Sequence, residues 1–417
     1  MALTKATYSM IVGSVVNVFD YMTTAEIADV TARTSGSDVT SAVRAALTGA
    51  PDSSAVYFPA GEYSIGNITI PSKKLTLFGD GRFQSVLTAR SDALSSNDYF
   101  VASSAYVENS TFGSEPIVVQ DLGFSGAGLT DNVFVLYGYY SRLTDCSFSG
   151  PTNTGAALLM TSDGISGSAC STTLVENRID HCNIQGADAS TYAFRIKSSG
   201  QKTTDAFISD NIIRNGSVLL TAMAGTVFDN NHLYANAAVT IGRLSIGSRV
   251  SNNYFEDAIN IDDCLDFNVQ VNDNTFLGRV TLSFGNSGTI ITLNDNTFQG
   301  SADLYHNYFS ATKHAVVNGG SFATSTPVVF SSGTSTGRVT FNRVFNKGLG
   351  YEQDGSRTAN TGRISLVSWG AAAPTTGDWN VGDKVINTTP TAGGNIGWVC
   401  TTAGAPGTWK TFGAITA

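Results

Sequence analysis

Apolar anchor residues return about every 22 positions through the middle of the chain, and Asn or Asp usually stands just before them. The local sequence is nearly constant, as in Asn-Asp-Asn-Thr-Phe, which ends at Phe276 and again at Phe298. The anchors are Phe124, Phe148, Ile184, Ile213, Leu233, Phe255, Phe276, Phe298, Phe322 and Phe345. A period of this length predicts a solenoid, in which each repeat buries its apolar face only against its neighbours.

Two polar columns precede the anchors, and we interpret both as structural. The Asn column, two positions before the anchor, is Asn211, Asn231, Asn253, Asn274 and Asn296. Stacked Asn side chains hydrogen-bond along a solenoid. The residues one place earlier are Asp210, Asn230, Asn252, Asp273 and Asp295, which are typical turn formers. Cys146 and Cys182 also stand two positions before their anchors, which predicts stacked thiols in the core.

The pattern divides the chain into four segments. Residues 1–85 contain a helical pattern at 38–48 followed by short strand-like runs, which predict a cap and the first turns of the solenoid. Residues 86–345 carry the repeat, and residues 346–365 are polar and turn-rich, which predicts a linker. Residues 366–417 contain all four Trp residues with paired Gly and Pro, and predict a small β module.

Three runs near the start resemble the opening of pectate-lyase-like phage tailspike proteins. They are Asn17-Val18-Phe19-Asp20-Tyr21, the run from Val56 to Tyr63, and Leu77-Phe78-Gly79-Asp80-Gly81. The resemblance implies an all-β, right-handed parallel β-helix with a short N-terminal capping helix and a small C-terminal β module. Met22-Thr23-Thr24-Ala25-Glu26 departs from it, because a glycine-rich run often stands there.

The resemblance also implies a setting and partners. Phage members of such families are typically homotrimers in the virion tail that degrade bacterial capsule or O-antigen on the host surface. The partners would then be a bacterial surface polysaccharide, two further copies of the chain, and phage tail or baseplate proteins. The C-terminal module would serve trimer stability or carbohydrate contact. Because the β-helix opening begins almost at Met1, we expect attachment through another protein or through a module that preceded this one.

The amino-acid composition limits the classes of partner that the chain is expected to bind. The chain has 417 residues, 42% of them apolar, and a net charge of -9, which argues against nucleic acid and anionic membrane as main partners. An acidic sugar bound by a local Arg or Lys remains compatible with this charge. No apolar run reaches the roughly 18 residues of a membrane span, so no membrane insertion is expected. Five scattered Cys without CxxC and four His without ligand spacing predict no metal site and no cofactor.

The columns on either side of the anchors predict one outer patch. Strand side chains alternate between faces, so residues next to an anchor point outward, and equivalent positions lie about 4.8 Å apart in successive turns. Three consecutive turns bring together Arg214, His232, Tyr234, Tyr254 and Glu256. A second strand follows each anchor, and its inward Val, Ile and Leu residues place Asp262 outward, beside Ser283 and Tyr305, with Asp263 next to it.

A second candidate cluster lies where the intervals between anchors are longest, from Phe148 to Ile213. It comprises Asp188, Tyr192, Arg195 and Lys197. These residues are equally compatible with a salt bridge inside a loop. For residues in loops outside the regular repeat, the distance from an anchor does not indicate which residues are neighbours. In a trimer, a site can also lie between subunits.

Three functions fit these candidates. In glycosidic hydrolysis, Glu256 would be the acid, Asp262 or Asp263 the base or nucleophile, and the outer patch would hold the sugar. In β-elimination from a uronic acid, Arg214, or Lys197 with Arg195, would neutralise the carboxylate, and His232 or Tyr234 would be the base. In a non-catalytic fibre, the same solenoid would only bind the glycan. The sequence names neither the polysaccharide, the bond nor the host.

Overall fold

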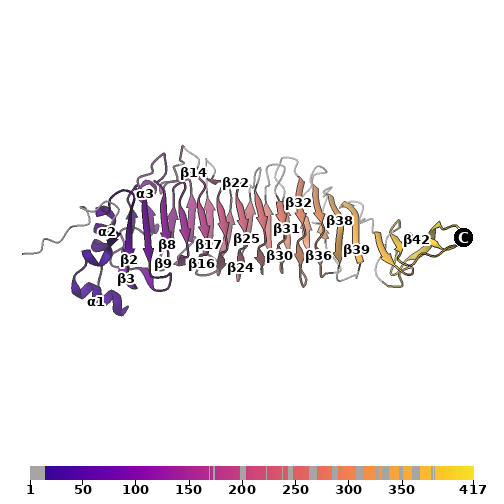
Figure 1. The fold of residues 1–417 in the computed structure, drawn as a ribbon, viewed down its shortest axis with the longest axis horizontal. Coiled ribbons are helices and arrows are strands. Elements are labelled where there is room, and N and C mark those ends of the chain that lie inside the picture. The colour runs from indigo at the N-terminus through magenta and orange to yellow at the C-terminus, as the bar shows by residue number, and fades with distance from the viewer. Residues whose placement is uncertain are drawn as a thin grey trace, which may run out of the picture. The chain divides into compact units, whose positions relative to one another are not determined.

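The computed structural model describes residues 15–417 with gaps at 169, 172–173, 198–202, 222, 237, 243–247, 263–269, 284–289, 307–313, 325–327, 331–337, 347–350, 359–366, 377–378 and 380. The chain forms two compact units, residues 1–243 and residues 244–417 (Figure 1). Both are built mainly of short strands stacked in parallel.

The N-terminal end of the first unit carries helices in addition to strands. They are the 3-10 helix η2 (Val18–Tyr21) and the α-helices α1 (Thr24–Ala32), α2 (Thr40–Gly49) and α3 (Ser104–Val107). Helix α2 confirms the predicted capping helix, and the Asp38 side chain accepts a hydrogen bond from the Thr40 amide at 2.9 Å. Helix α1 was not predicted. It begins in the run that departs from the family pattern, where Thr23 and Glu26 form a capping box.

Each turn of the first unit consists of three strands, which stack in three parallel rows. The first row is β1 (Val15–Asn17), β2 (Ser54–Phe58), β5 (Leu75–Gly79), β8 (Ile117–Gln120), β11 (Arg142–Thr144), β15 (Arg178–Asp180), β19 (Phe207–Ser209) and β23 (Val227–Asp229). The second row is β3 (Gly61–Ile65), β6 (Ser85–Ala89), β9 (Gly123–Thr130), β12 (Ser147–Pro151), β16 (Asn183–Gln185), β20 (Ile212–Arg214) and β24 (His232–Tyr234). The third row is β4 (Ile68–Ile70), β7 (Tyr99–Ser103), β10 (Asn132–Leu136), β13 (Ala156–Thr161), β17 (Tyr192–Lys197), β21 (Ser217–Leu220) and β25 (Val239–Gly242).

The second unit repeats the three rows, and shorter elements complete both units. Its first row is β26 (Arg249–Ser251), β29 (Gln270–Asn272), β32 (Ile290–Asn294), β35 (His314–Asn318) and β38 (Arg338–Asn346). Its second row is β27 (Tyr254–Phe255), β30 (Thr275–Phe276), β33 (Thr297–Phe298) and β36 (Ser321–Phe322). Its third row is β28 (Ile259–Asp262), β31 (Val280–Ser283), β34 (Leu304–His306) and β37 (Val328–Phe330). In the first unit, loops add β14 (Leu174–Val175), β18 (Thr203–Thr204) and β22 (Met223–Ala224). This arrangement confirms the predicted parallel β-helix.

The anchors face inward and lie in register, as the 22-residue period predicts. In the first unit Phe148 pairs with Phe124 and Ile184, and Ile213 pairs with Leu233. In the second unit the Phe276 ring lies 5.2 Å from Phe255 and 5.1 Å from Phe298 between ring centroids. Within each unit, each of these turns therefore supplies one large apolar side chain to an internal stack.

Phe345 is the exception, and its prediction as an anchor is wrong. Its side chain is 42% exposed, whereas Val344 beside it is fully buried. The register of β38 shifts between Phe341 and Val344, and Arg343 adopts a positive φ of 54°. This irregularity moves the inward-facing position one residue earlier, as a β-bulge does.

The Asn column is confirmed as a buried structural ladder in both units. The Asn211 side-chain amide donates to Asn231 at 2.9 Å, and the Asn274 amide donates to Asn296 at 3.0 Å. The residues before them take positive φ, from 52° at Asn230 to 59° at Asp210, as turn formers do. Cys146 and Cys182 are buried free thiols, as predicted.

The C-terminal part of the second unit leaves the β-helix pattern. Strand β39 (Tyr351–Thr358) lies in the range predicted as a linker and pairs antiparallel with β38. A separate four-stranded sheet follows, formed by β40 (Val367–Gly370), β41 (Lys384–Asn387), β42 (Asn395–Thr402) and β43 (Thr408–Ala414). Over the described residues, no helix is long and apolar enough to cross a membrane.

Candidate functional site

A cavity in the described part of the first unit lies on the outer face of its third row of strands. Leu159 and Thr161 of β13 pair in register with Arg195 and Lys197 of β17. Because alternate residues of a strand share a face, these four side chains form one outward-facing surface. Strands β13 and β17 thus supply the floor of the cavity.

Loops between turns form the walls. Helix α3 brings Tyr106 over this face, where it packs with Tyr137, Leu159 and Leu174 in a buried apolar cluster outside the β-helix. Ile165, in the loop after β13, packs against the same cluster. These covering residues turn a flat strand surface into a recess.

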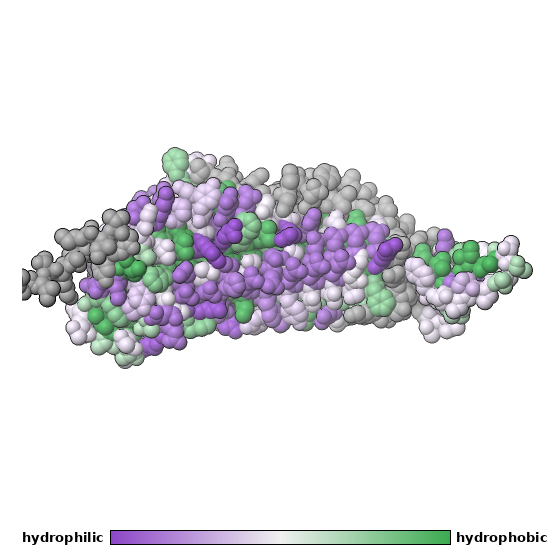
Figure 2. All heavy atoms as spheres, in the orientation of Figure 1, coloured by the Kyte–Doolittle hydropathy of each residue, from purple (hydrophilic) through white to green (hydrophobic). Residues whose placement is uncertain are grey.

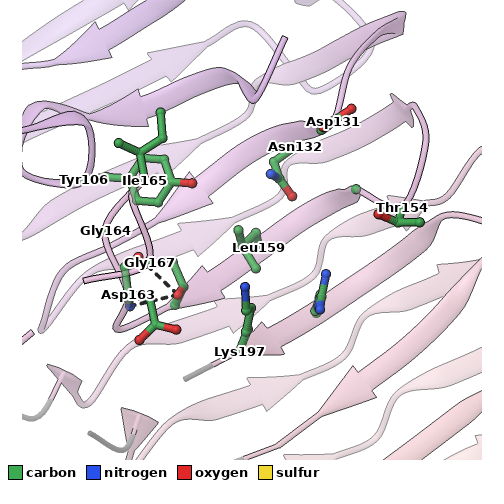
Figure 3. Close-up of a pocket in the computed structure, with 13 residues that line it drawn as sticks. Tyr106, Asp131, Asn132, Thr154, Leu159, Asp163, Gly164, Ile165, Gly167 and Lys197 are labelled. Atoms are coloured by element: carbon green, nitrogen blue, oxygen red, sulfur yellow. Dashed lines mark hydrogen bonds between the residues drawn. The ribbon is translucent and has the colours of Figure 1, made fainter. Parts of the chain in front are cut away.

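The recess has a volume of about 170 Å³. Figure 3 shows Asp131, Asn132 and Thr154 at one end and Asp163 near the other, with Leu159 and Lys197 between them. The Tyr106 hydroxyl points toward the same space (Figure 3). This volume is below the roughly 300–1,000 Å³ of pockets that enclose drug-sized ligands, so the recess suits one sugar unit or substituent of a longer chain.

Two cations line the recess, and neither has a carboxylate partner among the described residues. Arg195 lies over the Tyr192 ring at 4.6 Å from its centroid, and its buried Nε has no hydrogen-bond partner in the part of the chain that the structure describes. Lys197 is exposed at the end of β17. Among the described residues, neither side chain makes an ion pair. A guanidinium and an ammonium two residues apart on one strand can bind an anionic group together.

Carboxylates stand at both ends of the recess. Asp163 is only 4% exposed, and its amide donates to the Thr161 hydroxyl at 2.9 Å, which fixes the turn after β13. Asp131 lies at the opposite end, where its carboxylate accepts from the Asn153 side chain at 2.7 Å. Gly155 lies so close to the Asp131 backbone that a Cβ would be 1.7 Å from its carbonyl oxygen. The position of Asp131 therefore requires glycine at 155.

Tyr106 remains protonated under ordinary conditions. Burial, followed by the nearby negative charges of Asp98 and Asp163, raises the pKa of Tyr106 to about 12. Its hydroxyl is therefore a hydrogen-bond donor at neutral pH. A neutral donor, two cations and two carboxylates make the recess suitable for an acidic sugar.

The first-unit part of the predicted outer patch is assembled as expected. The Arg214 guanidinium donates to the Tyr234 hydroxyl at 2.8 Å, and the rings of His232 and Tyr234 lie 5.1 Å apart. The Arg214 Nε is buried and has no hydrogen-bond partner among the described residues. These three residues lie on the second row of strands, not in the recess on the third row.

The second-unit part of the patch is described only in part. Tyr254 is half-buried and Glu256 is exposed, at the end of β27. Asp262 ends β28 opposite Ser283, as predicted, but its side chain lies outside the described residues, as does Asp263. The roles predicted for these acidic residues stay predictions.

The predicted position of Tyr305 beside Asp262 needs correction. Tyr305 pairs with Thr281, and Thr281 pairs with Asn260, two residues before Asp262. Arg279 lies over the Tyr305 ring at 4.9 Å and forms a bidentate ion pair with Asp303, with N–O distances of 2.6 and 2.8 Å. The ring is therefore partly covered by a paired arginine, which the column analysis did not consider.

The structure brings together three residues of the second predicted cluster but not its acidic residue, Asp188. Tyr192, Arg195 and Lys197 share β17, but Asp188 is exposed and accepts hydrogen bonds from Ser190 at 2.8 and 2.6 Å. Those bonds lower the pKa of Asp188 and identify it as a turn residue. Sequence reasoning missed Tyr106, Asp131 and Asp163. The one signal for Asp163 was the apolar run 156–160 followed by Thr-Ser-Asp-Gly, a strand ending in a polar turn.

Among the described residues, no group of three or more His, Cys, Asp or Glu side chains is arranged to hold a metal ion.

The fold near the N-terminus agrees with the family comparison. Residues 26–124 match the family model described as rhamnogalacturonase A/epimerase, pectate lyase-like. The matched range covers the end of the N-terminal cap and the first turns. No curated protein sequence matches the chain.

One solved structure supports the fold, and two others show weaker overall similarity. The A-module of the mannuronan C-5 epimerase AlgE4 from Azotobacter vinelandii aligns with a TM-score of 0.50 and 13% identity, over 80% of this chain and 95% of that one. ORF18 of Geobacillus virus E2 aligns with a TM-score of 0.36 and 15% identity, and this chain spans 60% of it while 80% of this chain is covered. The Dettilon tailspike protein aligns with a TM-score of 0.35 and 12% identity, over 80% of this chain and 68% of that one.

Proposed function

We propose that the chain is a polysaccharide depolymerase whose substrate carries acidic sugars, and that the recess on β13 and β17 is its site. The observation that carries this proposal is the pair Arg195 and Lys197, which line the recess without an ion-pair partner among the described residues. An acidic sugar unit would supply the missing negative charge. Carboxylates at the two ends of the recess supply groups for acid–base chemistry.

Hydrolysis is the first reaction that this set of groups supports. It requires one carboxyl group that protonates the leaving oxygen and a second that attacks or activates water. We assign the first role to Asp163, which is almost fully buried, and the second to Asp131, at the end held by Asn153. Arg195 and Lys197 orient the acidic substituent, and the Tyr106 hydroxyl donates to a sugar oxygen.

β-Elimination is the second candidate, and the cation pair favours it specifically. Neutralising a uronate carboxylate acidifies the proton at the neighbouring carbon, which a base then removes as the glycosidic bond breaks. Digesting purified bacterial capsular and O-antigen polysaccharides separates the two reactions. Hydrolysis yields only new reducing ends, elimination also yields an unsaturated sugar that absorbs in the near ultraviolet, and a non-catalytic fibre yields neither.

The proposed setting is a phage tail spike that acts on the host cell surface. The support is the sequence resemblance at Asn17–Tyr21, Val56–Tyr63 and Leu77–Gly81, where the chain begins its β-helix. A homotrimer and attachment to tail or baseplate proteins belong to the same proposal. Light scattering of the purified chain tests the trimer, because a monomeric mass would contradict it.

Replacing Arg195 and Lys197 together by Ala should lower kcat/KM on an acidic polysaccharide by roughly 10- to 100-fold, mainly through KM. The reason is that the two cations bind the acidic group in both the ground state and the transition state. Arg249→Ala, a change of an exposed Arg in the second unit, is the matched control and should leave kcat/KM unchanged. An unaltered kcat/KM in the double variant would remove the recess as the substrate site.

Glu256→Gln distinguishes a catalytic site in the recess from a catalytic site on the outer patch. If Asp163 and Asp131 carry the chemistry, this exposed variant should keep its activity within about twofold of the original. A loss of several hundredfold with an unchanged melting temperature would instead support Glu256 as the acid, with Asp262 or Asp263 as its partner. Reducing-end release at matched protein concentration is the measurement.

A further inference from the structure

A second cavity of the first unit lies on the other side of helix α3 from the recess. The strand register places Thr69, Ala102, Val135 and Leu159 in one outward column of the third row. Tyr106 of α3 covers the middle two positions in the buried apolar cluster. Leu159 lines the recess, and Thr69, three strand spacings or about 14 Å away, lines the second cavity. Helix α3 therefore separates two cavities on one face of the β-helix.

This second cavity, the cap pocket, is formed by α2, β4 and α3. Its volume is about 450 Å³, within the roughly 300–1,000 Å³ of pockets that enclose small ligands. Four hydroxyl side chains and two charged side chains line it: Thr48, Thr69, Ser72, Ser104, Arg44 and Glu108. Hydroxyl groups both donate and accept hydrogen bonds, so this lining suits a ligand that carries hydroxyl groups itself.

Arg44 supplies the positive charge of the cap pocket and is held in place by the backbone. Its Nε and Nη2 donate to the Asn67 carbonyl at 3.1 and 2.6 Å. Asn67 is itself fixed, because its buried side chain accepts from the Ser95 amide at 2.6 Å and donates to the Ser96 carbonyl at 2.9 Å. Among the described residues, the guanidinium has no carboxylate partner.

Glu108 supplies the negative charge from the end of α3. Its amide donates to the Ser104 carbonyl at 2.9 Å, which fixes its backbone. Its exposed carboxylate makes no hydrogen bond or ion pair within the described part of the chain, so it does not pair with Arg44. Hydrophilic side chains cover much of the surface in Figure 2, so polarity alone does not mark a site. Two opposite charges that line one cavity without pairing do distinguish the cap pocket.

We propose that the cap pocket binds a zwitterionic sugar unit, with its carboxylate on Arg44 and its ammonium group on Glu108. Charge-assisted hydrogen bonds to both ends would satisfy the two unpaired side chains together. An anion alone would bind Arg44 but would also lie near the Glu108 carboxylate, and like charges at a contact are unfavourable. The four hydroxyl side chains favour a sugar over a simple amino acid. This site is independent of the recess and of any cleavage activity.

Calorimetric titration of the full chain with muramic acid, glucuronic acid and glucosamine tests the pocket. These sugars carry both charged groups, only the carboxylate and only the ammonium group, respectively. The Arg195→Ala/Lys197→Ala variant is the starting protein, so that binding in the recess does not contribute. We expect muramic acid to bind at least about fivefold more tightly than the other two. Adding Glu108→Gln should abolish its advantage over glucuronic acid without weakening the binding of glucuronic acid, which a collapsed pocket would not do.

The matched control is Glu176→Gln, the same change at an exposed residue that does not line the pocket. It should leave the affinities for all three sugars unaltered. If 6-aminohexanoate, a zwitterion without hydroxyl groups, bound as tightly as muramic acid, the charge pair would be supported with a free amino acid as its ligand. Equal affinities for the three sugars, no binding of muramic acid, or equal losses in Glu176→Gln and Glu108→Gln would overturn the proposal.

Discussion

Asp163→Asn should lower kcat for polysaccharide cleavage by about 100- to 10,000-fold with little change in KM. That range is what a general acid contributes when it transfers a proton in the transition state. Asparagine has nearly the same shape, and the amide of residue 163 can still donate to Thr161. The loss should therefore reflect missing proton transfer and not a collapsed turn. Reducing-end release under saturating substrate, with the melting temperature measured in parallel, checks this result.

The control for Asp163→Asn is Asp188→Asn. It makes the same chemical change at an exposed turn, where the side chain accepts hydrogen bonds from Ser190. The control should keep full activity. If Asp163→Asn also kept full activity, hydrolysis at the recess would be excluded. If the unsubstituted chain released unsaturated sugar and Asp163→Asn abolished that product, Asp163 would act in elimination and not in hydrolysis.

The regular part of the fold was predictable because one physical constraint recurs in every turn. Each turn must supply a large inward side chain, and five successive turns carry an Asn two positions before it, so Phe276 and Asn274 could be assigned from the sequence alone. The prediction failed at Phe345, where a bulge shifts the inward position to Val344. A bulge depends on one residue in the left-handed region, here Arg343, and nothing in the repeat indicates it.

The candidate site was predictable only in part, because some of its residues lie on a regular strand and others lie outside the repeat. Arg195 and Lys197 were found as neighbours on one strand, but Tyr106 and Asp131 are brought to them by loops that follow no period. Equivalent positions of the regular turns indicate Glu256 on the second row, but none of them belongs to the walls over β13 and β17.

Phe276→Ala should destabilise the second unit by about 3–5 kcal/mol, the usual cost of removing a fully buried Phe side chain. The ring is completely buried between Phe255 and Phe298, at centroid distances of 5.2 and 5.1 Å, so the truncation leaves a cavity bounded by both neighbours. In a solenoid each turn contacts only adjacent turns, so the loss should be local. Hydrogen exchange should speed up in peptides that cover β27, β30 and β33.

Two comparisons make this prediction specific to the stack. Thr275→Ala changes the half-buried outward neighbour in the same strand and should leave exchange in β27, β30 and β33 nearly unaltered. Peptides from α1 and β5, in the first unit, should exchange as before in both variants. Phe276→Leu should destabilise the second unit less than Phe276→Ala, because the leucine side chain partly fills the cavity. Equal exchange in Phe276→Ala and the unsubstituted chain would mean that the stacked anchors do not hold adjacent turns together.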